Sequence, residues 1–390
     1  FSLRKNTQKT QVQEIINQLE KEKSLRKNQV QEQIKSKFQA NQLLISNFQQ
    51  NEGSIDIQQQ EKSIKLKKIM STYESIIEQR IQNKRCSTQI DENIDQCNQS
   101  IEKPQYPFKY NSQSFIFIKS LGKGSHSEVF LAQDKYTGFL FAVKKLNIQK
   151  LIEMEMEEQF SCEIKIQYFL NQPNIIKLFY FFKQGNFFYL IMEYAQGNQL
   201  SRVQKQNTFL KEPQAAFYLL QISQAISYLH KINIMHRDIK TENIIITNEI
   251  AKLADFGYSR KSNQQNIRNT FCGTLDYLSP EIINGQNYDI YVDIWAFGVL
   301  TYQLLQGVAP FYEESQSETL DKIKEGKFMF QKWISDKAQY FVKSLLIINS
   351  EKRPSVKEIL HNNWLLEQAQ VYENQLKSYD DLEQELKQLY

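Results

Sequence analysis

The stretch Ile234–Ile246, IMHRDIKTENIII, decides the fold, together with Ala254–Gly257, ADFG, a few residues later. The first string sets charged and amide side chains between apolar runs that are typical of buried strands. Such charged groups are costly to bury unless they serve a site. Because a chance occurrence of both strings so close together is negligible, the pair predicts an active site in this part of the chain.

The side chains in these strings are those that phosphoryl transfer requires. Asp238 can accept or orient the proton of an attacking hydroxyl group, and Lys240 can neutralise charge that grows on the transferred group. Asn243 can bind a metal ion, and Asp255, twelve residues further on, can supply a second metal contact. Mg²⁺ suits such a site, since it takes one or two carboxylates together with phosphate oxygens. The sequence therefore predicts ATP and Mg²⁺ as cofactors.

A glycine-rich stretch and a lysine lie upstream of this site. The stretch Gly122–Val129, GKGSHSEV, stands between two predicted strands, where glycine lets backbone N–H groups approach phosphate oxygens. Its place between strands argues against a P-loop, and alone it would indicate no more than a turn. Lys144, in the apolar run AVKK, should find an anion such as a nucleotide phosphate. Glu163, nineteen residues later on a predicted helix, can pair with it.

Hydrophobic patterning divides the chain after its first hundred residues into two parts. From Phe115, short alternating runs predict strands, among them FIFIKSLG, EVFLAQ, FLFAVKKL and FYLIMEYA. After about residue 200, long amphipathic runs predict helices. A strand-rich part followed by a helix-rich part indicates two lobes with a cleft at their border. Residues 366–390 predict one amphipathic helix that packs on the domain or on a partner.

Residues 1–110 form an extension that is rich in Gln, Asn, Lys, Glu and Ser. Apolar residues recur three or four apart in parts of it, as on one face of a helix, but the pattern drifts and does not establish a long coiled coil. Partly helical segments, plain disorder and an independent globular domain all stay open as interpretations. Pro104 and Pro107 mark the boundary with the next part. We expect the extension to order on a partner or to self-associate through residues 1–105.

Charge and cysteine content exclude several classes of protein. The formal net charge is +4, and residues 1–105 account for all of it, with 17 basic against 13 acidic residues. A nucleic-acid partner is not expected, because that would need a dense basic stripe. The four cysteines form no C-x-x-C pair, which argues against a disulfide framework or a zinc module. No run approaches the roughly 20 apolar residues that cross a bilayer, so we expect an intracellular protein without a membrane span.

Taken together, these motifs resemble a protein kinase domain over residues 114–365, with an N-lobe at about 114–192 and a C-lobe at about 196–365. The resemblance implies the α+β bilobal protein kinase fold and transfer of the ATP γ-phosphoryl group to serine or threonine, because a lysine stands two residues after Asp238. It implies that ATP is bound by Leu121, Gly122, Lys123, Gly124, Val129, Ala142, Lys144, Met192, Glu193, Ala195, Glu242, Asn243 and Asp255. It implies structural support from Gln167, Leu178, His236, Arg237, Phe256, Glu281, Asp293 and Arg353.

Several strings resemble the Aurora kinases in particular, including EIKIQ, QPNIIKLFYFF and TFCGTLDYLSPEII. Gln167 stands at a spine position where Auroras have glutamine, and Thr270 matches their activation-loop threonine. The resemblance implies that phosphorylated Thr270 pairs with Arg237, that an activator docks on the N-lobe, and that the enzyme acts on protein substrates in cytoplasm or nucleus, at spindle, centrosome or basal body. The alternatives are a polo-like, calcium/calmodulin-type or cyclic-nucleotide-type kinase, or a pseudokinase scaffold.

The sequence also departs from the family pattern. Ser127 replaces the third glycine of the glycine-rich stretch, and Tyr258 follows D-F-G where Auroras have tryptophan. Gln303 stands where arginine-directed relatives have a glutamate. Glu242 could still hold an arginine two residues before the phosphoacceptor, but one carboxylate of the usual pair is gone. We therefore expect a weaker preference for basic substrates.

Overall fold

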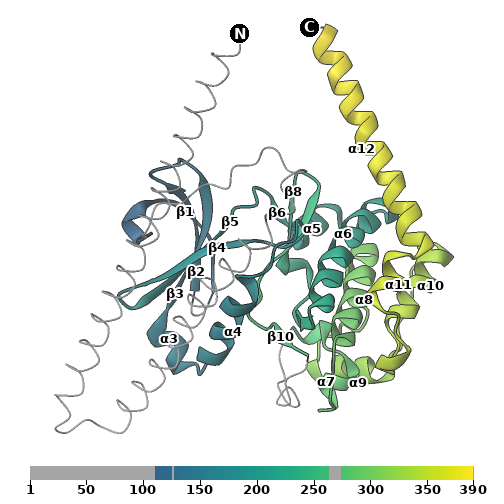
Figure 1. Cartoon of the computed structure of the whole chain (residues 1–390). Helices are drawn as coiled ribbons and strands as arrows, with labels where there is room; N and C mark the ends of the chain where they lie inside the picture. The colour runs from purple at the N-terminus through teal and green to yellow at the C-terminus, as the bar shows by residue number, and fades with distance from the viewer. Residues whose placement is uncertain (1–109, 125–126, 263–273, 390) are drawn as a thin grey trace, which may run out of the picture. The chain divides into compact units, whose positions relative to one another are not determined.

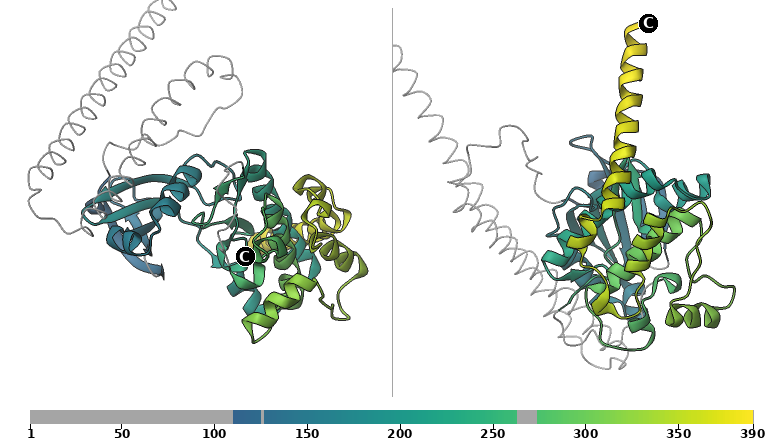
Figure 2. Two further views of the ribbon diagram at one scale, coloured as in Figure 1. Left: turned by 90° about the horizontal axis from the view of Figure 1, so that it is seen from below. Right: turned by 90° about the vertical axis from the view of Figure 1, so that its right-hand side faces the viewer.

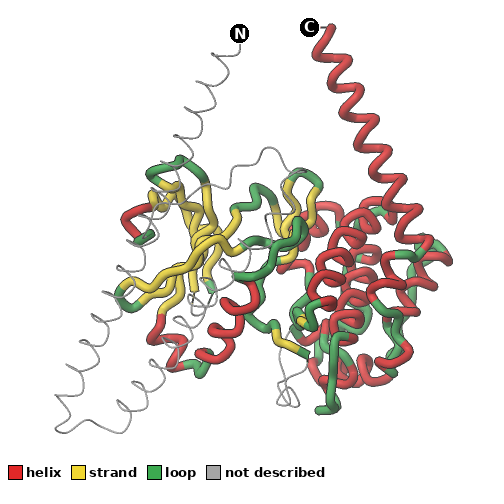
Figure 3. Tube along the Cα trace, viewed as in Figure 1, coloured by secondary structure: helices red, strands yellow, loops and turns green. Residues whose placement is uncertain are grey.

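The computed structural model describes residues 110–124, 127–262 and 274–389, and of residues 158, 261 and 379–389 it describes only the backbone. In Figure 1 a sheet-built N-lobe lies beside a helical C-lobe, and Figure 3 shows the same division as yellow strands against red helices. No helix within the described ranges is long and apolar enough to span a membrane. The two-lobed α+β fold expected from the sequence is confirmed.

The N-lobe is built on an antiparallel sheet with strand order β1-β2-β3-β5-β4. One face of this sheet carries apolar side chains that pack against α4, and the other face carries a layer of aromatic side chains. Because both faces are covered, the central strands carry apolar residues on each side, as the nearly continuous apolar runs of β4 and β5 show. The elements of the lobe are β1 (Phe115–Lys123), β2 (Ser127–Asp134), β3 (Leu140–Asn147), α3 (Ile148–Glu153), α4 (Glu157–Gln167), β4 (Leu178–Gln184) and β5 (Phe187–Glu193).

The C-lobe consists of helices with short strands on the side that faces the N-lobe. Its helices are α5 (Leu200–Asn207), α6 (Glu212–Lys231), α7 (Pro280–Ile283), α8 (Tyr291–Gln306), α9 (Gln316–Glu325), α10 (Asp336–Leu345), α11 (Val356–Leu360) and α12 (Asn363–Leu389). Its strands are β6 (Asn198–Gln199), β7 (Ile234–Met235), β8 (Ile244–Thr247), β9 (Ile250–Leu253) and β10 (Arg260–Lys261). Single 3₁₀ turns lie at Ser112–Ser114, Thr241–Asn243, Leu275–Tyr277 and Ser350–Lys352.

The core of the C-lobe forms around α6 and α8. Helix α8 is apolar on nearly every side, and it is buried over most of its length, as expected of a helix at the centre of a lobe. Trp295, on α8, is fully buried and stacks on Phe311 with ring centroids 5.4 Å apart. Gly307 ends the helix in the left-handed conformation that glycine adopts without strain. The segment Ile234–Ile246 packs against this core.

The C-terminal amphipathic helix begins slightly earlier than residues 366–390, since α12 starts at Asn363. Its first turns are fastened to α6, because the Trp364 indole N–H donates to Glu212 over 2.8 Å. Its far end extends beyond the body of the C-lobe, as the view from the side in Figure 2 shows. The start of α12 thus completes the C-lobe core, to which Trp364 and Leu365 belong.

Candidate active site

Register across the sheet gathers the predicted nucleotide-binding residues on one face. In β3, Ala142 and Lys144 point the same way, because side chains alternate along a strand. Val129 pairs with Lys144, and Met192 pairs with Ala142. Gly122 of β1 lies opposite Val129. Five residues from four strands therefore share the inner face of the N-lobe, toward α4 and the C-lobe.

The Lys144 ammonium group lies between two carboxylates. Its Nζ atom is 2.6 Å from Glu163 Oε1 and 3.6 Å from Asp255 Oδ1. Burial opposes the charge on Lys144, but the two carboxylates outweigh it and raise the pKa of the amine. The charge of Lys144 in turn lowers the pKa of Asp255. At neutral pH the site therefore holds a fixed cation next to an ionised carboxylate, Asp255, whose side chain is 48% exposed.

The segment before Asp238 is held by a buried carboxylate from α8. Asp293 is fully buried, and its two oxygens accept hydrogen bonds from the backbone N–H groups of His236 and Arg237, at 2.9 and 2.8 Å. His230 Nε2 lies 2.9 Å from the same carboxylate. Burial alone would raise the pKa of Asp293, yet the contacts with His230 and the Arg237 amide lower it. An ionised aspartate thus fixes the backbone just before the predicted catalytic residue.

Three of the predicted catalytic side chains converge within hydrogen-bond distance. Lys240 Nζ lies 2.9 Å from Asp238 Oδ2, and Asn243 Nδ2 donates to the same oxygen over 2.7 Å. Lys240 also donates to Thr274 Oγ1 at 2.7 Å. The Asp238 carboxylate is only 3% exposed, so its partners, and not solvent, set its orientation.

The donor set fits a Mg²⁺ ion that keeps part of its water shell. Asn243 directs its amide nitrogen at Asp238, which leaves its amide oxygen available as a ligand. The half-exposed Asp255 supplies a carboxylate. No cluster of three or more His, Cys, Asp or Glu side chains that could hold a metal occurs among the described residues. Two oxygen ligands suit Mg²⁺, which is usually bound by one or two protein carboxylates together with phosphate oxygens and water.

Backbone strain accompanies the site. Arg237 and Asp255 adopt positive φ angles of 65° and 61°, a conformation that residues other than glycine seldom take. Each such residue costs on the order of 1–3 kcal/mol, and such residues cluster at functional sites. The neighbouring contacts hold Arg237 in place, since its Nε donates to Tyr258 O over 2.6 Å and its Nη1 to the Tyr288 hydroxyl over 2.7 Å.

Four of the residues expected to give structural support are buried, namely Gln167, Leu178, His236 and Phe256. His236 and Phe256 pack edge to face, with ring centroids 4.9 Å apart. Leu178 belongs to the N-lobe core beneath the sheet, whereas Phe256 belongs to the C-lobe core. Gln167 is 1% exposed, and its amide nitrogen donates to the Ile176 carbonyl over 3.2 Å. A buried amide is therefore accommodated without leaving its donor unpaired.

A second buried ion pair supports the C-lobe beside the site. Arg353 makes a bidentate contact with Glu281, at 2.6 and 2.8 Å, and it also donates to the Ile347, Ile348 and Tyr291 carbonyls. Its guanidinium group lies 5.0 Å from the Trp295 ring. Glu281 and Arg353, which were both expected to give structural support, thus bind each other in the structure.

The remaining predicted residues are less constrained. Leu121, Lys123 and Gly124 lie at the exposed end of β1, and Ala195 lies just after β5. Glu193 ends β5, and its carboxylate binds Lys252 Nζ at 2.8 Å, so the side chain faces away from the nucleotide face of the strand. Glu242 lies in the 3₁₀ turn at Thr241–Asn243 and is exposed. Thr270 lies outside the described residues.

Sequence reasoning missed several residues that complete the site. His230 contacts Asp293, the Tyr258 carbonyl and the Tyr288 hydroxyl accept from Arg237, and Thr274 contacts Lys240. His230 and Asp293 are 63 residues apart in sequence. Pairs at such separations leave no local pattern, and only the fold brings them together.

A cationic lysine, an exposed carboxylate beside it, and a buried aspartate held by a lysine and an amide are the parts that transfer of a nucleotide phosphoryl group requires. The sequence model of the family described as "Protein kinase domain" matches residues 115–365, which contain all of these parts. The chain belongs to the protein kinase family.

Several similar curated proteins are Aurora kinases. The chain is 36% identical to the "Aurora kinase" of Candida glabrata over 68% of this chain and 75% of that protein. It is 37% identical to the "Aurora/IPL1-related protein kinase 2" of Caenorhabditis elegans over 68% of this chain and 88% of the relative. It is 39% identical to the "Aurora kinase" of Schizosaccharomyces pombe over 65% of this chain and 71% of that protein. The enzyme is an Aurora-like serine/threonine kinase that uses ATP and acts on protein substrates.

Proposed function

We propose that Asp238 orients the attacking serine or threonine hydroxyl and accepts its proton while the γ-phosphoryl group of ATP is transferred in line. The observation that carries this assignment is the orientation of the Asp238 carboxylate, which Lys240 and Asn243 hold on a backbone fixed by Asp293. A positioned carboxylate of this kind contributes about 10²–10⁴-fold to proton transfer.

The other residues divide the work of binding and charge stabilisation. Lys144, paired with Glu163, binds phosphate oxygens as a fixed cation. Lys240 neutralises charge on the transferred group, because its Nζ atom already lies at the reacting carboxylate. Asn243 and Asp255 would hold Mg²⁺, which supplies positive charge to the phosphate oxygens when bound. Val129, Ala142 and Met192 would enclose the adenine ring on the inner face of the sheet.

The test is to compare the wild-type enzyme with Asp238→Asn on a mixed serine/threonine peptide library. We expect the variant to lose transfer by about 10²–10⁴-fold while its affinity for MgATP stays within a few-fold. Nucleotide binding is measured by calorimetry on the same preparations. A variant that phosphorylates the library within ten-fold of the wild-type rate would overturn the assignment of Asp238.

Phosphorylation of Thr270 is the proposed activating event. A phosphate adds roughly −1.5 to −2 charges and would bind near Arg237, beside the catalytic loop. Arg237 already bonds to Tyr258 and Tyr288, so the phosphate would add to an existing network. The purified Thr270→Ala enzyme should therefore be less active than phosphorylated wild type. Full activity in that variant would show that phosphate at this position is not the switch.

Substrate preference should depart from that of strongly arginine-directed kinases. Gln303 is held in a neutral network, in which its Oε1 accepts from the Tyr277 hydroxyl and its Nε2 donates to Gln204. It therefore offers no charge to a substrate. Glu242 stays as the carboxylate of the expected pair and attracts a basic residue more weakly than two carboxylates would.

The cellular role rests on the Aurora relationship. We propose that the enzyme acts in mitosis at spindle, centrosome or basal-body structures, that an activator docks on the N-lobe, and that residues 1–105 self-associate. Residues 1–109 lie outside the described residues. Light scattering of the full chain tests self-association, because a dimer doubles the 46.2 kDa mass of one chain.

A further inference from the structure

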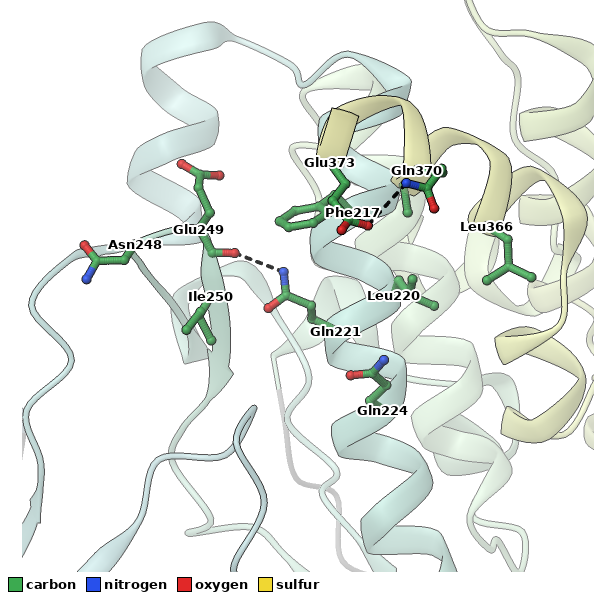
Figure 4. A pocket seen from close by; sticks show the side chains of 11 residues that line it. Phe217, Leu220, Gln221, Gln224, Asn248, Glu249, Ile250, Leu366, Gln370 and Glu373 are labelled. Atoms are coloured by element: carbon green, nitrogen blue, oxygen red, sulfur yellow. Dashed lines mark hydrogen bonds between the residues drawn. The ribbon is translucent and has the colours of Figure 1, made fainter. Parts of the chain in front are cut away.

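A pocket of about 430 Å³ lies on the C-lobe and shares no lining residue with the site described above. Figure 4 shows its three walls, which come from α6, from the turn between β8 and β9, and from α12. Its apolar lining comprises Phe217, Leu220, Ile250, Leu366 and Ala369. Ile250 and Leu366 are 43% and 41% exposed, so the pocket opens to solvent through apolar side chains.

The charged side chains of the lining are both acidic. Glu249 and Glu373 line the pocket beside four neutral amide side chains, and no lysine or arginine of the described residues lines it. Glu249 is held in place by two tyrosines, because its Oε2 atom accepts from the Tyr218 hydroxyl at 2.6 Å and from the Tyr372 hydroxyl at 3.2 Å. Burial, together with Glu249, raises the pKa of Tyr218, so this phenol stays a donor.

The carboxylate of Glu249 therefore has one oxygen, Oε1, that can accept a hydrogen bond from a ligand. Both tyrosines bond to Oε2, and Oε1 receives no donor among the described residues. Glu373 is already paired with Lys377 at 2.8 Å, and its side chain is 46% exposed. A ligand that brings a cation to Glu249 would meet a preorganised acceptor next to an apolar floor.

Strand addition at this place is blocked. The side chain of Gln221 donates to Glu249 O over 3.0 Å and accepts from Ala251 N over 2.9 Å. The Asn174 side chain donates to Ala251 O over 3.0 Å. Because these side chains occupy the backbone groups at the start of β9, a partner cannot bind there as an additional β-strand. Recognition must come from side chains that enter the pocket.

We propose that this pocket is a docking site for a peptide segment of a protein substrate, in which a bulky apolar residue stands next to a lysine or arginine. The apolar side chain would fill the space between Leu220, Ile250 and Leu366, and the basic group would bind Glu249 Oε1. A pocket of this size holds one or two such side chains and not a folded domain. Binding of the peptide to the pocket does not depend on the proposed active site. Only the expected effect of docking on catalysis rests on the proposed function.

The first experiment measures binding alone. Fluorescent ten-residue peptides, in which one Leu or Phe and one neighbouring Lys are moved through a Gly/Ser background, are titrated with the full-length chain and followed by polarisation. We expect saturable binding for peptides with adjacent apolar and basic residues. Leu366→Asp should abolish it, whereas Val371→Asp should not, because Val371 is equally exposed at 42% on the same helix but does not line the pocket.

The second arm tests the charge. Glu249→Gln should weaken binding about ten-fold or more, since hydrogen bonds between charged groups are worth that much. A peptide with Gln in place of Lys should lose the same factor, and the two changes together should lose no more than either alone. Glu367→Gln is the control, because Glu367 lies on α12 outside the pocket and pairs with Lys337.

The third arm tests the link to catalysis. The best peptide, fused through a flexible linker to a phosphoacceptor sequence, should lower KM several-fold in the wild-type chain and not in Leu366→Asp. Both enzymes should phosphorylate the unfused acceptor equally, which also shows that the variant is folded. The proposal would be overturned if Val371→Asp removed binding as much as Leu366→Asp did, or if no peptide bound up to millimolar concentration. A change of oligomeric state in Leu366→Asp would also overturn it. Loss of all transfer with docking intact would instead count against the active-site assignment.

Discussion

Removing the carboxylate of Glu281 should destabilise the C-lobe strongly. Its partner Arg353 has a fully buried guanidinium group, and Glu281 is only 6% exposed. In Glu281→Ala the arginine would keep its bonds to backbone carbonyls but would lose both charged hydrogen bonds, at 2.6 and 2.8 Å. The result is a buried cation without a counter-ion.

The expected magnitude follows from that uncompensated charge. Breaking one partner of a buried ion pair costs about 3–5 kcal/mol. In a domain of this size each kcal/mol lowers Tm by about 2–4 °C, so we expect a drop of roughly 6–20 °C. The matched control is Glu367→Ala, whose ion pair with Lys337 is 53% and 66% exposed and should contribute less than about 1 kcal/mol.

The assay is urea unfolding together with calorimetry on wild type, Glu281→Ala, Glu367→Ala and the double variant Glu281→Met/Arg353→Met. The double variant should recover part of the loss, because it leaves no buried charge unpaired. If Glu281→Ala changes stability no more than Glu367→Ala does, the pair is not a structural support and the reasoning from burial fails. Equal losses in the single and double variants would show that backbone contacts of Arg353, and not its charge pairing, stabilise the lobe.

Three other changes have defined outcomes. Gly197→Ala should destabilise the protein, because the added Cβ would lie 1.7 Å from the Ile246 carbonyl oxygen; a melting curve identical to wild type would contradict this close approach. Burial lowers the pKa of His236 below its usual 6.5, although nearby carboxylates oppose this shift, so on acidification the unfolded chain binds the proton before the folded chain does. The free energy of unfolding should therefore be at its full value above about pH 6.5 and fall by up to ~1.4 kcal/mol per pH unit below it. His236→Phe should remove that slope. Gln303→Glu should increase the preference for arginine upstream of the phosphoacceptor on a peptide array, since it adds the second carboxylate beside Glu242.

The fold was largely predictable because its signals are local. Alternating apolar residues from Phe115 indicated strands, and the long amphipathic runs after about residue 200 indicated helices, as the structure shows. The contact between Lys144 and Glu163 was also predictable, since a lysine in an apolar strand needs an anion. Residue type and the pattern of apolar residues along the chain were enough for these inferences.

Contacts over long sequence separations could not be read in the same way. Lys240 and Thr274 are 34 residues apart, and Tyr218 on α6 is 31 residues from Glu249, which it contacts in the structure. The strained backbone at Asp255 was equally hidden, because aspartate has no general preference for positive φ strong enough to predict it. Such features depend on the packed structure and not on local propensity.

The arrangement around Asp293 explains how a strained loop can be rigid. Positive φ at Arg237 costs on the order of 1–3 kcal/mol, and an isolated loop would relax it. Asp293 opposes that relaxation, because it accepts from the successive backbone N–H groups of His236 and Arg237 and is itself buried in α8. Rotating this backbone would leave an ionised carboxylate buried without its donors, which costs more than the strain. The orientation of Asp238 is therefore set by the C-lobe core before any substrate arrives.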